Sequence, residues 1–181
     1  AVFVGFDQDG IPRHAHKRGS GSESTYKGNQ DGSLPEYSFH WHGQAEPASN
    51  SRNGVQSDHS DACPLQNQGG RLYLFEAPID MLSFISMHKN GWRDHSYAAA
   101  CGVSDQVLWQ MMQDNPNIQR VYLCLDSDEP GQTAAKRISD KLFTKGIQHE
   151  ILVPIHKDWN EDLLHPAEEM EEETECMQPM L

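Results

Sequence analysis

The fold is decided by the stretch Leu72-Tyr73-Leu74-Phe75-Glu76-Ala77-Pro78-Ile79-Asp80 and by a second one, Val121-Tyr122-Leu123-Cys124-Leu125-Asp126-Ser127-Asp128-Glu129-Pro130-Gly131. Each is an apolar run of strand length that ends in carboxylates and turn residues and is followed by a helical pattern. This order is typical of the carboxyl end of a strand in an α/β sheet, where ligands bind in a crevice. We therefore expect Glu76, Asp126 and Asp128 to meet there.

Length and composition allow one core. The 181 residues, 36% of them hydrophobic, are enough for one sizeable core with an appendage. The formal net charge is −13, and residues 166–181 contribute six Asp or Glu and no Lys or Arg. Such acidity argues against unaided binding to nucleic-acid phosphates, because that affinity comes largely from Lys and Arg. Divalent cations would reverse the sign of the charge at a carboxylate cluster.

The four cysteines lie far apart and form no C-x-x-C pair, which argues against a zinc ribbon or a redox motif. The sequence shows no signal peptide and no apolar run of about 18 residues, so we expect a cytoplasmic chain without membrane contact. Because it begins without Met and within a strand pattern, we also expect it to be part of a longer protein.

The first 70 residues predict a small β-rich domain and a linker. Residues 1–6 and 11–17 read as a hairpin, residues 18–32 as a loop and residues 37–41 as a strand, which together form a domain over 1–42. Residues 43–70 have hardly any large apolar side chain and predict a flexible linker or insert.

Residues 71–165 predict repeated strand–helix units. We expect a parallel sheet of about four strands with helices on both faces, followed by an acidic tail over 166–181 that is disordered or a solvated helix end. Ile79, Leu82 and Ile85 recur at helical spacing in the first helix, and Ala134, Ile138, Leu142 and Phe143 recur in the third. The expected strands are 72–75, 97–101, 120–125 and 147–154, and the expected helices are 78–89, 105–113 with Ser104 as its cap, 131–145 and a short one from Asn160.

The carboxylates themselves point to metal chemistry. In an Asp-x-Asp at a strand end both side chains can face one crevice. Carboxylates brought together repel unless a cation is present, and oxygen ligands suit Mg²⁺ or Mn²⁺, which then takes substrate phosphates as further ligands. Acidic residues at these positions are also ordinary helix caps: Asp128 or Glu129 could favour the start of the third helix, and Asp80 that of the first. Both interpretations stay open on spacing alone.

The motifs Leu-Phe-Glu-Ala-Pro-Ile-Asp-Met-Leu-Ser (74–83) and Leu-Asp-Ser-Asp-Glu-Pro-Gly-Gln-Thr-Ala-Ala (125–135) also resemble a known family. They are similar to the Toprim domain, a Rossmann-like α/β fold shared by bacterial primases, topoisomerases and some nucleases. The resemblance covers residues 71–165 and is strongest to primase-related proteins of plasmids and conjugative elements. Residues 4–15 and Tyr37-Ser38-Phe39 resemble the small uncharacterised domain that precedes Toprim in those proteins.

The resemblance implies roles for the carboxylates. Glu76 would be a metal ligand or the acid/base of nucleotidyl transfer, and Asp126 and Asp128 would be the metal-binding Asp-x-Asp. Gly131 would let the next helix begin close to the site. Asp80 and the segment 158–162 match accessory acidic positions. The implied cofactor is Mg²⁺ or Mn²⁺, and the implied partners are DNA, nucleotide triphosphates and other replication or mobilisation domains.

Other polar groups allow a functional and an ordinary interpretation. The pairs His14/His16 and His40/His42 could bind a transition metal, but polar-face histidines on a hairpin are the commoner arrangement. Arg13, Lys17, Arg18 and Lys27, with Tyr26 nearby, would suit a nucleic-acid backbone or are simply solvated. Arg137 and Lys141 could reach phosphate or are exposed charges of a helix face.

The leading hypothesis is Mg²⁺-dependent nucleotidyl transfer on DNA, as part of a primase-like protein of a mobile element. A Toprim nuclease would use the same carboxylates with water as the nucleophile. A third hypothesis is a non-catalytic Toprim scaffold that binds nucleic acid or a partner. Ordered metal at Glu76, Asp126 and Asp128 would favour either enzyme, and a basic groove leading to it would favour DNA as the substrate. A closed or uniformly acidic crevice would favour the scaffold.

Overall fold

The computed structural model describes residues 1–19, 26–43 and 70–166. The expected linker and the acidic tail therefore lie almost wholly outside the described residues. The elements, in chain order, are β1 (Val2–Phe6), β2 (Pro12–Arg18), β3 (Lys27–Asn29), the 3-10 helix η1 (Pro35–Tyr37), β4 (His40–Trp41), β5 (Gly70–Phe75), α1 (Pro78–Met87), the 3-10 helix η2 (Trp92–Asp94), β6 (Ser96–Ala99), α2 (Gln106–Asp114), β7 (Ile118–Cys124), α3 (Glu129–Thr144), β8 (Gln148–Ile151) and α4 (Trp159–Leu164).

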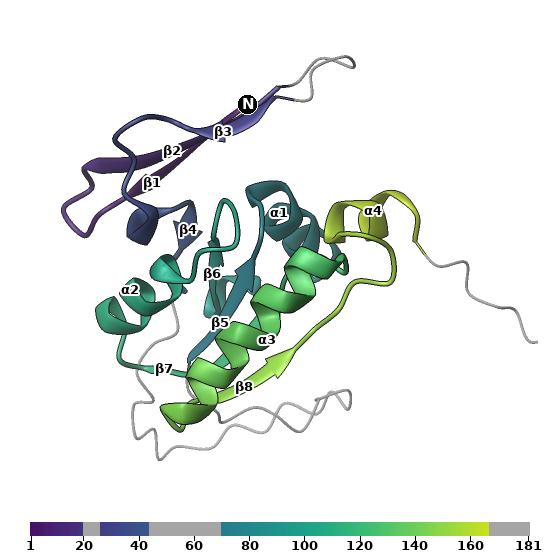
Figure 1. Ribbon diagram of the computed structural model, residues 1–181. Coiled ribbons are helices and arrows are strands. Elements are labelled where there is room, and N and C mark those ends of the chain that lie inside the picture. Colours follow the sequence, from purple (N-terminus) through teal and green to yellow (C-terminus); the bar gives the residue numbers. More distant parts are fainter. Residues whose placement is uncertain (20–25, 44–69, 167–181) are drawn as a thin grey trace, which may run out of the picture.

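A five-stranded sheet with the order β4-β6-β5-β7-β8 forms the centre of the molecule (Figure 1). Strands β6, β5, β7 and β8 are parallel, and β4 adds an antiparallel edge. Short helical connections between parallel strands place helices on both faces of such a sheet. The expected sheet of about four parallel strands flanked by helices is confirmed.

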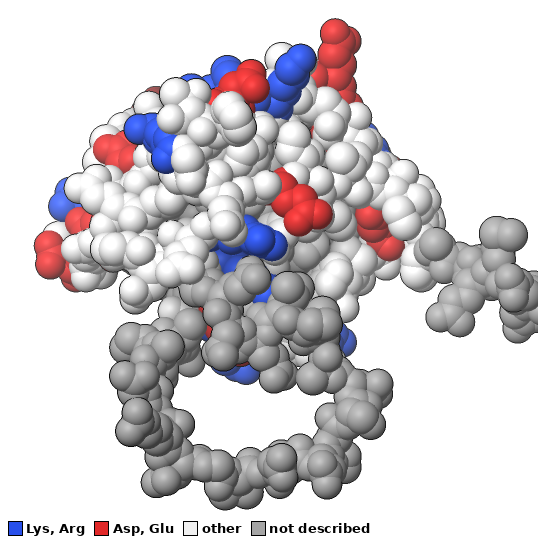
Figure 2. Space-filling view, turned by 90° about the horizontal axis from the view of Figure 1, so that it is seen from below, with Lys and Arg blue, Asp and Glu red and all other residues white. Residues whose placement is uncertain are grey.

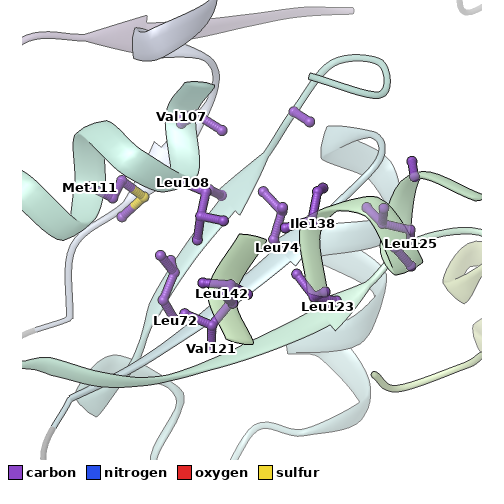
Figure 3. Packing of buried hydrophobic residues seen from close by; sticks show 14 of the residues in the cluster. Leu72, Leu74, Val107, Leu108, Met111, Val121, Leu123, Leu125, Ile138 and Leu142 are labelled. Carbon is purple, nitrogen blue, oxygen red and sulfur yellow. The ribbon is translucent and has the colours of Figure 1, made fainter. Parts of the chain in front are cut away.

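Alternate residues of the central strands enter two cores. On one face, strand residues such as Leu72, Leu74, Val121 and Leu123 pack against α2 and α3, as Figure 3 shows. The opposite face packs aromatic side chains, including stacked Tyr73 and Tyr122, against α1 and α4. Residues 72–75 of β5 and 121–124 of β7 are buried, as expected for strands of a parallel sheet that is covered on both faces.

One residue on each of two expected helix faces is wrong, whereas the rest of the expected face of α3 is buried. In α1 the buried apolar side chains are Met81 and Phe84, whereas Leu82 is 41% exposed. Phe143 was expected inside with Leu142, yet it is 79% exposed at the end of α3. In both helices the apolar residues occupy more than one face of the helix. Periodicity alone therefore did not show which of them the sheet would cover.

The N-terminal segment forms a separate antiparallel sheet, β1-β2-β3, above the carboxyl ends of the central strands in Figure 1. The expected hairpin is present, but part of the expected loop over 18–32 is strand β3, which pairs with β2. The strand expected over 37–41 is shorter, and as β4 it pairs with β6 of the central sheet. Residues 40–41 therefore belong structurally to the α/β core, because their backbone hydrogen bonds complete its edge.

The N-terminal sheet makes a close backbone contact with the chain that leads into β4. Gly5 of β1 lies against the backbone of Tyr37 and Ser38, and a Cβ atom at position 5 would lie 1.7 Å from the Tyr37 carbonyl oxygen. Only glycine allows this approach. Among the described residues, no helix is long and apolar enough to cross a membrane.

We expect Gly5→Ala to lower the free energy of unfolding by about 2–3 kcal/mol, because the added methyl group must push β1 away from residues 37 and 38. Denaturant unfolding followed by circular dichroism measures the change. Gly28→Ala is the matched control, since its Cβ would meet nothing nearer than the Tyr26 hydroxyl at 3.5 Å. Equal stability of the two variants would contradict the close contact.

Candidate functional site

A pocket of about 520 Å³ lies between the N-terminal sheet and the carboxyl ends of the central strands. Its residues come from both parts of the chain, which makes it a shared site. The α/β core contributes Glu76, Ala77, Asp80, Cys101, Gly102, Asp126, Lys157 and Asp158, and the N-terminal sheet contributes His16, Arg18, Tyr26, Lys27, Gly28 and Asn29.

Strand register brings the two principal carboxylates together. Phe75 and Cys124 are paired at the ends of neighbouring strands β5 and β7, and the chain turns into Glu76 and Asp126 just beyond them. Glu76 Oε2 and Asp126 Oδ1 are both buried, and neither has a hydrogen-bond partner among the described residues. Buried carboxylate oxygens without partners are costly, so this pair is suited to a cationic ligand.

Two more acidic residues line the same pocket. Asp80, in the first turn of α1, is only 4% exposed, and its Oδ1 accepts a hydrogen bond from the Asn160 N–H at 3.3 Å. Asp158 caps α4 by accepting from the Glu161 N–H at 2.8 Å. The pairing of Asp80 with the backbone of α4 thus joins α1 and α4 at the edge of the pocket.

Burial and mutual repulsion shift these acids toward the protonated form. Burial, with the charges of Glu76 and Asp80, raises the pKa of Asp126 to about 7. Burial and the charge of Asp158 raise the pKa of Asp80 to about 6. The pKa of Glu76 is also raised, by burial and by Asp128, although Lys27 and Lys157 act in the opposite direction. Perturbed acids in a cleft are typical of functional sites.

Asp128 is placed differently from its partner in the Asp-x-Asp motif. Its Oδ1 accepts a hydrogen bond from the Gly131 N–H at 3.0 Å, so Asp128 is the N-cap of α3 and does not line the pocket. A Cβ at Gly131 would lie 2.4 Å from the Asp126 carbonyl oxygen. Glycine therefore allows α3 to begin directly against the strand end that carries Asp126, as the sequence analysis expected of it.

The structure separates the basic residues that the sequence analysis grouped. Arg18 and Lys27 line the pocket on its N-terminal side, and Lys157 lines it from the core. Arg13 instead pairs with Asp7 at 2.6 Å in another groove. Figure 2 shows the molecule from below, away from this pocket, where charged side chains of both signs are scattered among uncharged ones.

Arg137 and Lys141 are both engaged elsewhere. They lie on α3 and pair with Asp105, at 3.5 Å and 2.7 Å respectively. Asp105 is also the residue before α2, where Ser104 had been expected as the cap. This triad joins α2 to α3, and it leaves the proposed phosphate contacts of Arg137 and Lys141 outside the carboxylate pocket.

The two histidine pairs differ: His14 and His16 are buried, whereas His40 is half-buried and His42 is exposed. His14 and His16 are 3% and 6% exposed, and the Nδ1 atom of His16 is 2.7 Å from Asn29 Oδ1. His40 bonds through Nδ1 to the Ser38 carbonyl at 2.6 Å. The interpretation of His14 and His16 as polar-face residues is therefore wrong, because both are buried and His16 lines the pocket that the N-terminal sheet shares with the α/β core.

Sequence reasoning missed several residues of the pocket. His16, Tyr26 and Lys27 were considered only as parts of the N-terminal domain, and Lys157 was not considered at all. Their place in the site depends on how the N-terminal sheet lies over the core. The one available signal for Lys157 was its position directly before the acidic segment 158–162.

The donor atoms fit Mg²⁺, although the side chains as placed do not form a closed cage. Within residues 1–19, 26–43 and 70–166, no group of three or more His, Cys, Asp or Glu is close enough to hold a metal ion. Mg²⁺ is usually bound through one or two carboxylates, several waters and substrate phosphates. Glu76 and Asp126, each with an unpartnered oxygen, supply that smaller set of ligands.

The chain belongs to the family described as Toprim-like, which matches residues 73–163. Residues 1–45 match a second family, described as a protein of unknown function (DUF3991). No curated protein matches the chain significantly.

Solved primase structures share the fold. The primase fragment of the bacteriophage T7 primase-helicase protein has a TM-score of 0.58 at 17% identity, with 91% of this chain and 57% of that chain covered. A bacteriophage T7 lagging-strand DNA polymerase structure with primase domains of two gp4 subunits bound to an RNA/DNA hybrid and dTTP has a TM-score of 0.57 at 16% identity, covering 91% and 70%. A DNA primase domain from Pseudomonas aeruginosa has a TM-score of 0.56 at 14% identity, covering 92% and 47%. The chain thus spans little more than half of the T7 primase fragment.

Asp126→Asn is expected to stabilise the metal-free protein at pH 8. Because the pKa of Asp126 is raised from 3.8 to about 7, ionisation of this side chain destabilises the folded state. The penalty is small near pH 4 and complete above pH 7. The substitution should raise the free energy of unfolding by about 1–2 kcal/mol at pH 8 and change it little at pH 4.

Denaturant unfolding at both pH values, in the presence of a chelator, measures this difference. Asp140→Asn, an exposed acidic residue of α3, is the control for general charge effects. The same stabilisation at pH 4 and pH 8, or an equal effect in the control, would contradict the repulsion between buried carboxylates.

Proposed function

We propose that the chain performs Mg²⁺-dependent nucleotidyl transfer on DNA, as the primase-like part of a longer plasmid or conjugative-element protein. The observation that carries the proposal is the pair of buried oxygens of Glu76 and Asp126, which have no partner among residues 1–19, 26–43 and 70–166 and lie at a pocket that basic residues also line. The primase domains that share its fold, two of them described with an RNA/DNA hybrid and dTTP, support the choice of substrate class.

In this proposal Glu76 and Asp126 hold the metal ion, and Asp80 lies behind them as a further acidic group. A bound Mg²⁺ would polarise a phosphate and orient the attacking hydroxyl in line with the leaving group. Glu76, whose pKa is raised by burial and by Asp128, would in the alternative role act as the base that takes a proton from that hydroxyl. Asp128 contributes indirectly, since it caps α3 and keeps the backbone of Asp126 in place.

The basic side chains of the pocket complete the proposed substrate site. Arg18 and Lys27 extend from the N-terminal sheet and Lys157 from the core, so a phosphate chain would meet positive charge on both sides. Tyr26 is 56% exposed beside them and offers a ring on which a base can stack. A pocket that contains both acidic and basic side chains suits a metal–nucleotide complex. We therefore favour a nucleotide substrate over the scaffold hypothesis, which expects a closed or uniformly acidic crevice.

A Toprim nuclease is the second candidate. The same pair of carboxylates would serve hydrolysis of a DNA strand with water as the attacking group. The pocket favours synthesis, because its three basic residues surround a space beside the acids large enough for a nucleotide. Activity assays with and without nucleotides separate the two functions.

We expect Glu76→Gln and Asp126→Asn each to weaken Mn²⁺ binding, measured by calorimetry on residues 1–181, by about tenfold or more. Nucleotide triphosphate should tighten metal binding to the wild type, because phosphate oxygens complete the coordination sphere. Asp140→Asn should bind Mn²⁺ like the wild type. Unchanged binding in both site variants would overturn the proposed metal site.

Activity of the same variants then identifies the reaction. With single-stranded DNA, Mg²⁺ and nucleotide triphosphates, the wild type should extend or begin a primer, and Glu76→Gln should lose this activity. Cleavage of the DNA without nucleotides would identify the nuclease instead. Metal-independent DNA binding with neither activity would identify the scaffold.

A further inference from the structure

The segment 155–158, which lies between β8 and α4, carries two residues of the pocket. Lys157 and Asp158 both line it, although the segment itself has neither helical nor strand structure. Connecting segments of this kind are usually mobile. This one is instead held by hydrogen bonds from two sides.

Asp162 of α4 holds the first side. Its carboxylate is buried, with a residue exposure of 9%. Oδ2 accepts the Ile155 N–H at 2.9 Å, and Oδ1 accepts the His156 N–H at 2.7 Å and lies 2.9 Å from His156 Nδ1. The Lys157 N–H donates to Glu161 Oε2 at 3.2 Å. Each backbone N–H from 155 to 157 therefore has a side-chain acceptor on α4.

Ser127, the middle residue of the Asp-x-Asp motif, holds the second side. Its hydroxyl lies 2.8 Å from the His156 carbonyl oxygen and 3.1 Å from that of Lys157, so its single proton is shared between them. The Ser127 N–H also donates to the Lys157 carbonyl at 2.9 Å. The segment that carries Lys157 is thereby bonded directly to the chain between Asp126 and Asp128.

These contacts have a functional consequence in the proposed site. Fixing the backbone of a residue costs conformational entropy. Here the hydrogen bonds hold the backbone of Lys157 before any ligand arrives, so ligand binding does not have to order it. Only the side chain of Lys157 then has to become ordered when it contacts an anionic group.

We propose that Ser127 and Asp162 are positioning residues, which hold segment 155–158 so that the Lys157 ammonium contacts a phosphate of the nucleotide triphosphate at the site. This inference rests on the proposed function, since it names how that site holds its nucleotide. It assigns a role to the residue between the two aspartates of the motif and to an acid that does not line the pocket.

Affinity for a Mg²⁺–nucleotide triphosphate complex, measured by calorimetry on residues 1–181, tests the proposal. We expect Lys157→Ala to weaken binding about tenfold and Ser127→Ala about three- to tenfold. Because Ser127 acts through Lys157, the double variant should bind no more weakly than Lys157→Ala alone. Ser127→Thr keeps the hydroxyl and should restore most of the affinity.

Two further measurements separate positioning from a general loss of structure. Hydrogen exchange of the amides at 155–157 should be faster in Ser127→Ala and Asp162→Asn, while amides of β5 and β7 keep their protection. Mn²⁺ binding without nucleotide should stay as in the wild type for Ser127→Ala. Ser139→Ala is the control, because it removes an α3 hydroxyl that is hydrogen-bonded to His149 of β8. It should change neither hydrogen exchange at 155–157 nor nucleotide affinity.

The outcomes distinguish this inference from the proposed function. If the wild type binds metal and nucleotide but Ser127→Ala binds equally well, or if its effect adds fully to that of Lys157→Ala, the positioning role is wrong and the proposed function stands. Unchanged exchange at 155–157 would also overturn the role. If the wild type binds neither metal nor nucleotide, the proposed function fails, and this inference fails with it.

Discussion

The parallel pairing of β5 with β7 is the constraint on which the site depends. It aligns Phe75 with Cys124, and the two strands end together, so Glu76 and Asp126 leave the sheet side by side. The pairing is secured by apolar packing on both faces of the sheet, because most residues of these strands are buried. A slip of one residue would turn every side chain to the other face. The same packing that stabilises the core thus places two acids where neither finds a partner among the described residues.

Stability and function oppose each other at this edge of the sheet. Four acids line one pocket, and the pKa of Asp126 rises to about 7 because burial and its acidic neighbours disfavour its charge. Electrostatic destabilisation of this kind is common at functional sites, where a bound ligand offsets it. Hydrogen bonds offset part of this cost. Asp80 and Asp158 accept backbone N–H groups of α4, and Asp128 accepts a backbone N–H of α3. Three of these acids therefore have backbone partners, whereas Glu76 Oε2 and Asp126 Oδ1 have none within the described part of the chain.

The N-terminal sheet changes what the core can bind. Without it the carboxylates would face solvent at the open end of an α/β sheet. With it, Arg18 and Lys27 lie across from them, and Lys157 approaches from the segment after β8. Contact between the two parts is close, since Gly5 lies directly against the backbone that leads into β4. A domain whose family is described only as of unknown function therefore forms one side of the pocket in this chain.

The sequence alone determined the α/β class, the strands that are followed by Glu76 and Asp126, and the glycine in the first turn of α3, because apolar runs, periodicity and turn residues are local signals. It did not decide that Asp128 would cap α3 outside the pocket, which depends on the rotation of the chain after β7. Leu82 and Phe143 were assigned to the core because local periodicity cannot tell which apolar residue a neighbouring layer covers. The places of Arg18, Lys27 and Lys157 were decided only by tertiary structure, since segments far apart in the chain meet at the pocket through packing that no single stretch encodes.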